Sequence, residues 1–474
     1  MNYGSDLVEV EPGIAAVLLV RFLALVTLWR PVFPQERSFQ RAVRQAVGAL
    51  LVVGSATLTR ILASLGRDQQ DWSADYKLHA RAEWNEQELF DALLPSALAH
   101  CPGRFVPVAL DDTRLKKTGK RIPTAFWQRD PLSPPFHVNL QWGLRFLQAS
   151  LLLPLHRKHN VNARAIPVRF VTAPSLKKPG AKATVQEQAH FREQRKQYNL
   201  SQQSVRLLTG LRESLDRAGV FRKPLLVAGD GSFCNRALFR TPLERVDLLC
   251  RSRADVRLCR PAPAGSRRTY DEQKFTPEQV RQDESIPWQS TKLWHGGKRR
   301  KLRYKEVGPV LWQSGAGRRA LRLLVVAPVP YRRTPRSRLL YRRPAYLLTT
   351  DQSTPAVQLL QVYLDRWEIE VNHREEKTIL GVGQAQLWNR KSVARQPALV
   401  VAAYSALLLA SLEAYGATRN EAYRLLPKWR RKSQRPSCLD LVTLLRQQWH
   451  ERPKTAAALE THSSYQQMIL SAAA

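Results

Sequence analysis

Two apolar segments that each end in aspartate constrain the fold of this chain of 474 residues more than any other feature. Residues 104–119 (RFVPVALDDTRLKKTG) carry an apolar run that ends in Asp111 and Asp112, and residues 224–233 (PLLVAGDGSF) carry one that ends in Asp230. Short apolar runs of this kind predict buried strands, and one sheet could bring their aspartates side by side. An aspartate after a strand is also a common turn or cap residue, so neither segment alone identifies a site.

The segments between and after these two runs predict a mixed α/β fold. Residues 138–153 and 165–173 resemble strands, residues 181–219 predict a long polar helix, and residues 246–253 predict a strand that follows a short helix. The expected order is therefore three strands, a helix, a strand, a short helix and a strand. The region before residue 100 reads as helical.

A third feature is the mixed-charge segment 363–377, YLDRWEIEVNHREEK. At about 100° per residue on a helix, with Arg366 as zero, Lys377, Glu370 and Tyr363 lie at about 20°, 40° and 60°. One carboxylate, two cations and a phenol then share a narrow stripe. The alternative is an ordinary solvated helix held by charge pairs four residues apart.

The other acidic side chains of this segment fall on different faces of the same helix. Asp365, Glu368, Glu375 and Glu376 lie between about 180° and 280° in this geometry. We expect these four carboxylates to face solvent.

The spacing of the stripe also resembles a known signature. Tyr, two residues, Arg, three residues, Glu, six residues and Lys is similar to the motif around the third acidic residue of DDE transposases of bacterial insertion sequences, in the insertion sequence four superfamily and its relatives. Asp230 matches the second acidic position, and the acidic residue before Thr113 matches the first. The resemblance covers roughly residues 104 to 415 and implies a ribonuclease H-like catalytic core, which the predicted order of strands and helices fits.

This resemblance makes Asp112, Asp230 and Glu370 the expected catalytic acids and metal ligands. Asp112 is preferred at the first position because it directly precedes Thr113, and Asp111 is the alternative, since adjacent strand residues face opposite sides. Three carboxylates suit oxygen-preferring Mg²⁺, and two such ions roughly 4 Å apart would clamp the attacking and leaving oxygens of a phosphodiester. We expect Mn²⁺ to substitute for Mg²⁺.

The resemblance implies DNA-binding roles for the rest of the stripe. Arg366 and Lys377 would hold phosphates of the transposon end, and Tyr363 would contact the DNA backbone. Tryptophans in or near the segment that precedes the signature could stack on a base flipped out of the duplex. Trp312 is preferred there over Trp288 and Trp294, although tryptophan is more often a core residue.

Charge predicts a nucleic-acid partner independently of the resemblance. The chain has 75 Lys and Arg against 39 Asp and Glu, a formal excess of 36. Residues 295–345 hold 15 of these cations against the single acid Glu306, and they include Lys298, Arg299 and Arg300. Phosphate contacts by such residues give affinity without sequence information. We therefore expect double-stranded DNA as the partner.

Five regions follow from these patterns. They are a helical N-terminal DNA-binding domain (1–100), the first part of the catalytic core (101–253), a basic β-rich insertion (254–345), the second part of the core with the signature helix (346–415) and a basic helical C-terminal region (416–474). No recognition helix stands out in the first region, so a helical packing or dimer domain is the alternative there. Transposition joins two DNA ends, so a homodimer is expected.

Three functions are compatible with these features. The preferred one is a transposase that binds the terminal inverted repeats of its element, cleaves DNA with two metal ions and transfers the 3′ ends to target DNA, with or without DNA hairpins. The alternatives are a catalytically silent, domesticated DNA-binding protein and a ribonuclease H-like nuclease without strand transfer.

Cysteines and apolar runs bear on the compartment. The five cysteines form no C-x-x-C pair, so neither a disulfide framework nor a zinc site is predicted. The apolar runs at residues 14–29 and from residue 398 are read as buried helices rather than membrane spans. We expect a cytoplasmic, nucleoid-associated protein.

Overall fold

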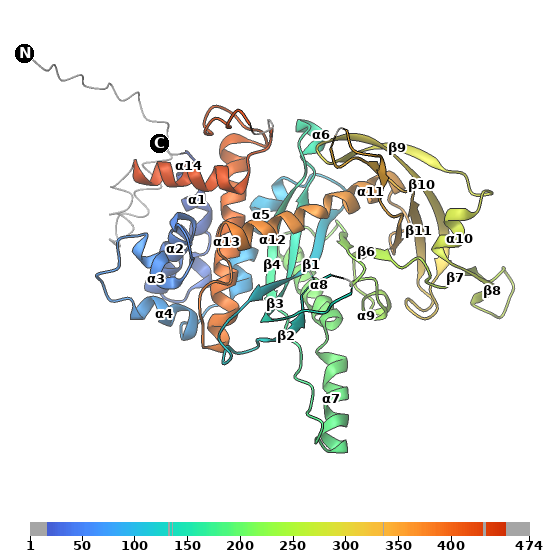
Figure 1. Ribbon diagram of the computed structural model, residues 1–474, viewed down its shortest axis with the longest axis horizontal. Helices are drawn as coiled ribbons and strands as arrows, with labels where there is room; N and C mark the ends of the chain where they lie inside the picture. Colours follow the sequence, from blue (N-terminus) through green and yellow to red (C-terminus); the bar gives the residue numbers. More distant parts are fainter. Residues whose placement is uncertain (1–16, 131–132, 135, 335, 430–432, 452–474) are drawn as a thin grey trace, which may run out of the picture.

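The computed structural model describes residues 17–130, 133–134, 136–334, 336–429 and 433–451 (Figure 1). The start of the apolar run at residues 14–29, part of the basic KWRRK segment at 428–432 and the end of the C-terminal region therefore lie outside the described residues. Within them the chain is mixed α/β, with a large mixed sheet and helices at both ends, as the sequence predicts.

The strands form one large sheet and one small hairpin. They are β1 (Val106–Lys116), β2 (Phe126–Arg129), β3 (Leu140–Leu153), β4 (Arg164–Thr172), β5 (Leu225–Gly229), β6 (Val246–Ser252), β7 (Leu258–Pro261), β8 (Tyr270–Phe275), β9 (Gln289–His295), β10 (Lys298–Leu311), β11 (Ala320–Val326), β12 (Pro330–Tyr331), β13 (Leu340–Tyr341) and β14 (Ala345–Thr349). The large sheet runs β2-β3-β1-β5-β6-β14-β11-β10-β7-β8, with β4 on β3 and β9 on β10.

Helices pack at one end of this sheet and on its faces. They are α1 (Val17–Thr27), the 3₁₀ helix η1 (Arg30–Val32), α2 (Glu36–Leu51), α3 (Leu58–Ala63), α4 (Ser73–Ala80), α5 (Glu86–Ala99), α6 (His156–His159), α7 (Val185–Gln197), α8 (Leu200–Arg217), α9 (Arg236–Arg240), α10 (Pro277–Gln282), α11 (Ala356–Asp365), α12 (Trp367–Thr378), α13 (Arg390–Tyr415) and α14 (Cys438–His450). The helix expected over residues 181–219 is thus two helices, because Asn199 caps a new helix at Leu200.

The central strands have the pairing that positions the aspartates. β3 is antiparallel to both β1 and β4, whereas β5 is parallel to β1 and β6. In the β1–β5 register Leu110 lies opposite Gly229, so the next residues of the two strands, Asp111 and Asp230, leave the pairing at the same edge. Parallel pairing therefore brings together two acids that are 119 positions apart in the sequence.

The β-rich segment 254–345 continues the central sheet instead of forming one of its own. β14 pairs with β6 on one side and with β11 on the other, and β10 and β7 follow. The predicted boundary at residue 345 falls on the first residue of β14. The prediction of β structure is correct, but backbone hydrogen bonds join the insertion to the core.

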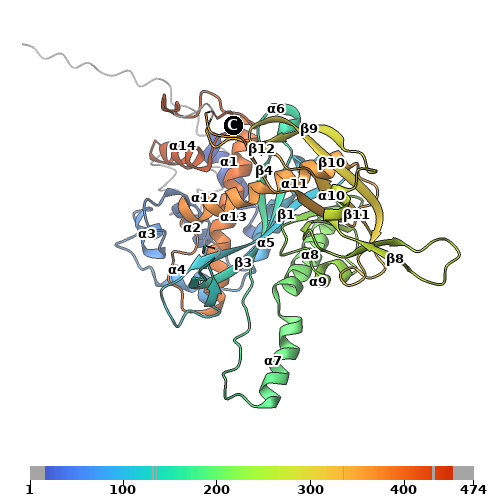
Figure 2. The ribbon, with the colours of Figure 1, turned by 45° about the vertical axis from the view of Figure 1, so that its right-hand side comes forward.

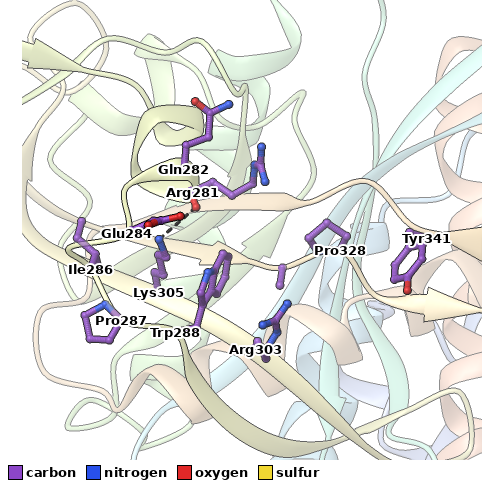
Figure 3. A pocket seen from close by; sticks show the side chains of 11 residues that line it. Arg281, Gln282, Glu284, Ile286, Pro287, Trp288, Arg303, Lys305, Pro328 and Tyr341 are labelled. Atoms are coloured by element: carbon purple, nitrogen blue, oxygen red, sulfur yellow. Dashed lines mark hydrogen bonds between the residues drawn. The ribbon is translucent and has the colours of Figure 1, made fainter.

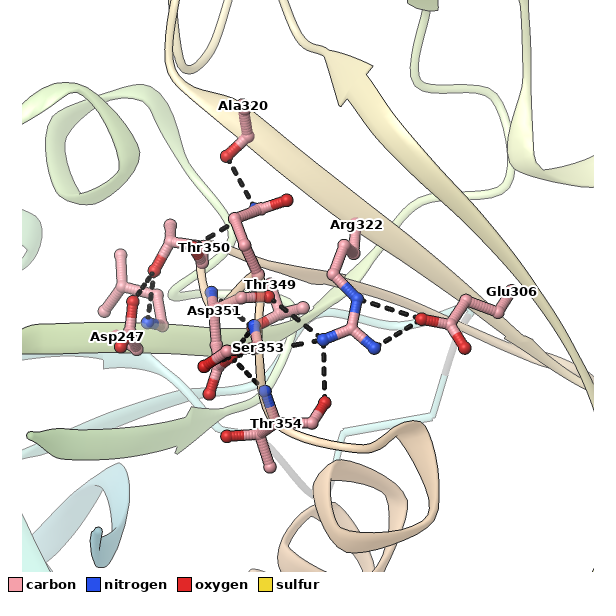
Figure 4. A network of polar contacts seen from close by, with 11 residues as sticks. Asp247, Glu306, Ala320, Arg322, Thr349, Thr350, Asp351, Ser353 and Thr354 are labelled. Carbon is pink, nitrogen blue, oxygen red and sulfur yellow. Dashed lines mark hydrogen bonds and ion pairs between the residues drawn. The ribbon is translucent and has the colours of Figure 1, made fainter. Parts of the chain in front are cut away.

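An arginine network holds the far part of the sheet to the start of α11 (Figure 4). Arg322 on β11 forms an ion pair with Glu306 on β10, and its guanidinium also donates to the carbonyl of Thr354 at 2.7 Å. The Asp351 carboxylate accepts the backbone N–H groups of Ser353 and Thr354 at 2.8 and 2.7 Å. The loop that leads into α11 is therefore fixed by charge-assisted hydrogen bonds.

The helices at the two ends of the chain form one layer around α13. α13 contacts α1, α2, α4 and α5 from the N-terminal region, α14 from the C-terminal region, and β4 of the sheet. Their apolar side chains belong to one continuous core with β1 and β3. The N-terminal helices are thus covered by the protein over their apolar faces, which is the packing role considered as the alternative. A DNA-binding role for this region stays a prediction.

α13 is the one helix among the described residues that is long and apolar enough to cross a membrane. Its apolar window is 83% buried inside the protein. Asn389 caps its N-terminus, and its side chain accepts the backbone N–H groups of Lys391 and Ser392. The structure therefore confirms that the run from residue 398 is a core helix packed on the sheet. All five cysteines are free thiols.

Candidate functional site

The first acidic pair lies on β1, which continues through the aspartates to Lys116. Asp111 lies directly opposite Gln148 of β3, and it shares a sheet face with Ala109. Ala109 packs in a cluster with Ile369 of α12, whereas Leu110, next to Asp111, packs in the main core. Side chains alternate along a strand, so Asp111 is on the face that α12 covers, and Asp112 points to the opposite one. The geometry favours the alternative, Asp111, over the preferred Asp112.

Asp230 follows β5 at a tight turn. Its carboxylate accepts the backbone N–H of Ser232 at 2.8 Å, which fixes the turn. Gly229 before it leaves no room for a side chain, because an added Cβ would lie 2.9 Å from Cβ of Phe233 and 3.2 Å from the Cys250 sulfur. Close packing under the turn thus holds the Asp230 backbone in place.

Glu370 and Arg366 occupy the joint between two helices. The segment expected as one helix is α11 and α12, and Arg366 stands between them with helical dihedral angles, φ −49° and ψ −31°. Its guanidinium donates to Glu370 Oε1 at 3.0 Å and lies 5.8 Å from the Tyr363 ring centre. Three of the four stripe residues are therefore in contact. The fourth is Lys377, whose pKa is lowered by burial, while the charges of Glu376, Asp111 and Asp112 oppose that shift.

Electrostatic interactions link the aspartates of the first two motifs to each other and to Arg366 of the third. Burial raises the pKa of Asp111 to about 7, the charges of Asp230 and Asp112 act in the same direction, and Arg366 opposes them. Burial also raises the pKa of Asp112, which Arg145 and Arg114 oppose. The pKa of Asp111 is thus raised by the charge of Asp230, which follows β5, and lowered by that of Arg366, which is hydrogen-bonded to Glu370. Nearby negative charges disfavour the ionised form of a carboxyl group, and a nearby cation favours it.

The donor set fits a hard divalent cation. Asp111, Asp230 and Glu370 offer only carboxylate oxygens, the ligands that Mg²⁺ prefers. Burial is the main cause of the raised pKa of Asp111, and the charges of Asp230 and Asp112 add to it, so a cation at this position would stabilise the ionised carboxylate. Within the part of the chain that the structure describes, no three acidic, His or Cys side chains are already close enough together to hold an ion. Binding would require these side chains to move closer, starting with Glu370 leaving Arg366.

His373 on α12 approaches the same place. Its Nδ1 lies 3.9 Å from Asp111 Oδ2. Burial lowers the pKa of His373 to about 3, and the charges of Lys377 and Arg366 act in the same direction. The imidazole is therefore neutral at neutral pH, and the contact with Asp111 is not an ion pair.

The expectation that the other acids of this segment face solvent is wrong. Asp365, Glu368, Glu375 and Glu376 are all less than 9% exposed, whereas the Glu370 side chain is 35% exposed. The sheet, Tyr404 of α13 and Arg435 cover the sides of the helix that carry these acids, and its exposed side carries Trp367, Arg374 and Thr378. Three of the buried carboxylates have partners from distant parts of the chain, His156 for Asp365, Arg435 for Glu368 and the Tyr404 hydroxyl for Glu375.

A cationic groove opens beside the stripe. It has a volume of about 870 Å³, and Tyr363 and Arg366 line it together with Trp294. Its remaining cations come from three different segments and are Arg251, Arg300, Arg342 and Arg343. Burial lowers the pKa of His295 in its wall, and the charges of Arg342 and Arg300 add to that effect. Arginines interleaved with aromatic rings are typical of grooves that bind nucleic-acid strands.

Sequence reasoning missed part of this groove. Arg251 lies at the end of β6, where it reads as an ordinary exposed strand residue. The sequence predicts a strand at residues 246–253, but nothing in it indicates that Arg251 lies near the groove. At the opposite wall the Gln361 side chain of α11 accepts the backbone N–H of Trp294 at 2.9 Å and donates to the Trp294 carbonyl at 3.0 Å.

The predicted DNA-binding residues of the insertion fall in different places. Lys298 and Arg299 are exposed at the β9–β10 hairpin, and Arg300 lines the groove. Trp312 is partly buried with its ring edge-on to Phe239, 5.7 Å between centres. A stacking role for Trp312 would require the ring to leave this packing, so the structure gives that prediction no support.

The other two tryptophans are also engaged within the protein. Trp288 lines a separate hollow of about 740 Å³, where the Lys305 ammonium lies 4.8 Å and the Arg303 guanidinium 5.5 Å from its ring centre (Figure 3). Lys305 also donates to the carbonyls of Val280 and Arg281. Trp294 donates its indole N–H to Asn162 at 2.7 Å. Trp294 alone of the three lines the groove beside the stripe.

Comparison with known proteins adds no name to this site. No protein-family model matches the chain, and no curated protein matches it.

Proposed function

We propose that this chain is a DDE-type DNA transposase that cleaves DNA at the ends of its own element and joins the freed 3′ ends to target DNA. The observation that carries the proposal is that Asp111 of β1 and Asp230 after β5 interact, and that Arg366 joins Asp111 to Glu370 of α12, beside a groove lined by arginines. Carboxylates for metal ions next to cations for phosphates are what phosphodiester cleavage and transfer require.

The strand order supports a ribonuclease H-like core. β4-β3-β1-β5-β6 has three antiparallel strands followed by two that are parallel to the first. Asp111 follows the part of β1 that pairs with β5, and Asp230 follows β5 itself. The third acidic residue, Glu370, comes from α12. The strands and helices that the sequence predicts follow one another in the predicted order, with the short strand β2 and the short helix α6 in addition.

The chain's own residues would bind and orient the DNA. Arg366 reaches from the stripe into the groove, so it can exchange its contact with Glu370 for a phosphate oxygen. Lys377 lies near the two aspartates of β1 and can hold a second phosphate. Tyr363 lines the groove and can contact the DNA backbone. Two Mg²⁺ ions, when bound by the three carboxylates, would acidify the attacking hydroxyl and stabilise charge on the leaving oxygen.

Incubation with DNA tests the proposal directly. The full chain is mixed with a duplex that carries the ends of its element and a supercoiled plasmid target, with Mg²⁺, Mn²⁺ or EDTA. We expect cleaved ends and plasmid insertions with either metal ion and neither product with EDTA. DNA that is bound but never cut would favour a catalytically silent DNA-binding protein, and cut products without insertions would favour a nuclease.

Two matched variants separate the roles of adjacent aspartates. Asp111→Asn is expected to abolish cleavage, because Asp111 is on the face that α12 covers, whereas Asp112→Asn is expected to keep more than about a tenth of it. Loss of 10²-fold or more is typical when a group that stabilises the transition state is removed. Equal loss in both variants, or loss in Asp112→Asn alone, would contradict the assignment of Asp111. A circular dichroism spectrum of each variant checks whether it is folded.

A homodimer is part of the proposal because two ends must be held together during joining. Gel filtration of the chain with and without the end-bearing duplex measures it, and we expect a species with two chains in the presence of DNA.

A further inference from the structure

One segment of the protein projects away from the rest. Residues 174–199 leave β4, run out as a loop and return as α7, and in two views this helix extends from the body of the protein with the loop beside it (Figures 1 and 2). No residue of α7 is buried. We call residues 174–199 the arm.

The arm has a defined structure although nothing covers it. Thr184 and Glu187 form a capping box, in which each side chain accepts the backbone N–H of the other residue, at 2.8 and 3.2 Å. At its base, Gln203 of α8 donates to the carbonyls of Pro174 and Tyr198, and the Arg206 guanidinium lies 5.1 Å from the Tyr198 ring centre. The base is therefore anchored to α8, and the tip is exposed to solvent.

A helix of this kind gains little from the fold that carries it. Isolated helices shorter than about 12–15 residues are marginal in water, and most helical stability in proteins comes from packing an apolar face. α7 has 13 residues and no such face, and Val185 is 85% exposed. Such a helix is stabilised by charge pairs along it, such as Lys196 with Glu193 at 2.8 Å, and its exposed sides are available to a binding partner.

The charge of the arm identifies the chemistry of that partner. The arm holds six Lys and Arg against two Glu, a formal surplus of four. At about 100° per residue, Arg192, Arg195 and Lys196 lie within an arc of about 100° on α7. The loop that runs beside the helix carries the other three cations, Lys177, Lys178 and Lys182. This stripe includes one apolar side chain, Val185, among three cations, and a surface dominated by cations fits a polyanion better than a protein surface.

We propose that the arm binds the sugar–phosphate backbone of duplex DNA, outside the stretch of DNA that occupies the groove. The inference rests on the proposed function in taking DNA as the partner. α7 is about 20 Å long at about 1.5 Å per residue, so it covers more than half of a helical turn of about 34–36 Å. The groove is lined by other parts of the chain, so the arm lengthens the DNA contact and adds no residue to the acidic site.

Charge removal on the arm tests the proposal. The six cations Lys177, Lys178, Lys182, Arg192, Arg195 and Lys196 are changed together to Gln, and binding of a random duplex of about 40 base pairs is measured between 50 and 300 mM salt. Each lost phosphate contact makes the dependence of log K on log salt shallower by about 0.9. If about half of the six cations contact phosphates, the slope falls by about 3 and affinity at low salt falls by more than tenfold.

Two controls make the result specific. Lys177→Arg, Lys178→Arg and Lys182→Arg keep the charge at the same positions and are expected to leave both slope and affinity unchanged. Trypsin cuts after Lys and Arg, and the exposed arm of the free wild-type chain should be cut early and be protected when the duplex is added. Because no residue of α7 is buried, the six-fold variant should unfold at the same temperature as the wild type.

The outcomes separate this inference from the proposed function. A wild-type chain that binds no duplex overturns both. A wild-type chain that binds duplex with the same slope as the six-fold variant, and whose arm stays open to trypsin, overturns only the role of the arm. Protection of the arm in concentrated protein without DNA, together with a variant that no longer self-associates, would assign the arm to a second copy of the chain and overturn DNA as its partner.

Discussion

The buried carboxyl group of Glu376 gives a stability prediction that does not depend on any activity. Glu376 lies on α12 and is 1% exposed, and neither of its carboxyl oxygens has a hydrogen bond of ordinary geometry. Burial raises its pKa to about 8, whereas Gln148 across the helix–sheet interface and Lys377 beside it lower the pKa only in part. At neutral pH the folded protein therefore holds Glu376 in its neutral, protonated form.

The magnitude follows from linkage between protonation and folding. In the unfolded chain Glu376 has its ordinary pKa of 4.5 and ionises freely, whereas the folded state prevents ionisation up to about pH 8. Its contribution to stability is therefore fully present below pH 4.5 and is lost as pH rises toward 8. At about 1.4 kcal/mol per pH unit, the free energy of unfolding is lower than at acid pH by about 3 kcal/mol at pH 7 and by less than about 1 kcal/mol at pH 5 because of this group.

Glu376→Gln replaces the acid with a neutral side chain of the same shape, so it should remove this pH-dependent loss. We expect the variant to gain stability over the wild type by up to about 3 kcal/mol at pH 7 and by less than about 1 kcal/mol at pH 5. Urea unfolding followed by tryptophan fluorescence at both pH values measures the difference. The matched control is Glu213→Gln on the exposed side of α8, which should change neither value. A gain that is equal at pH 5 and pH 7, or a loss at pH 7, would refute the reasoning.

Three further predictions concern the groove, a buried histidine and a helix contact. Changing Arg342 and Arg343 of the groove to Gln should make the salt dependence of DNA binding shallower by about 2, because each phosphate contact contributes a slope of about 1. Burial lowers the pKa of His79 to about 3, so the stability that the neutral imidazole contributes is present above pH 6.5 and is lost as pH falls. The free energy of unfolding should fall by about 2 kcal/mol at pH 5 for this reason. His79→Gln should remove that part of the acid sensitivity in urea titrations. Gly48→Ala should lower the free energy of unfolding by about 1–3 kcal/mol, since an added Cβ would lie 2.8 Å from the Ile61 carbonyl oxygen.

Each of these has an outcome that contradicts it. An unchanged salt slope in the double arginine variant would remove the groove from the DNA contact. Equal acid sensitivity with and without His79, compared between pH 5 and pH 7, would show that this imidazole is protonated in the folded state. A stable Gly48→Ala variant, with an unfolding temperature equal to that of the wild type, would show that α2 and α3 can separate at no cost.

Local pattern was sufficient to predict the elements that carry the site. The apolar runs before Asp111 and Asp230 are strands, the spacing from Tyr363 to Glu370 brings Tyr363, Arg366 and Glu370 together, and the run from residue 398 is a buried helix. These features depend on hydrophobic period and on residues close in sequence, which the chain shows directly.

Burial of the acids on α12 could not be predicted in the same way. The helical wheel places Glu368, Glu375 and Glu376 away from the stripe, and such positions on a surface helix face solvent. Here Arg435 and Tyr404, from segments far along the chain, cover that side and pair with two of the three carboxylates. Nothing within the helix indicates that these partners exist.

The sequence by itself determined the strands formed by the apolar runs before Asp111 and Asp230, the charge excess that favours a polyanion and the four-residue spacing that joins Arg366 to Glu370. Only the tertiary structure decided which aspartate of β1 faces α12, because the side that a helix covers depends on packing and not on local pattern. It also decided that residues 254–345 extend the central sheet and that arginines from β6, β10 and the segment before β14 meet in one groove. The physical reason is that strand pairing and charge convergence join residues far apart in the chain, and a single sequence carries no direct record of such contacts.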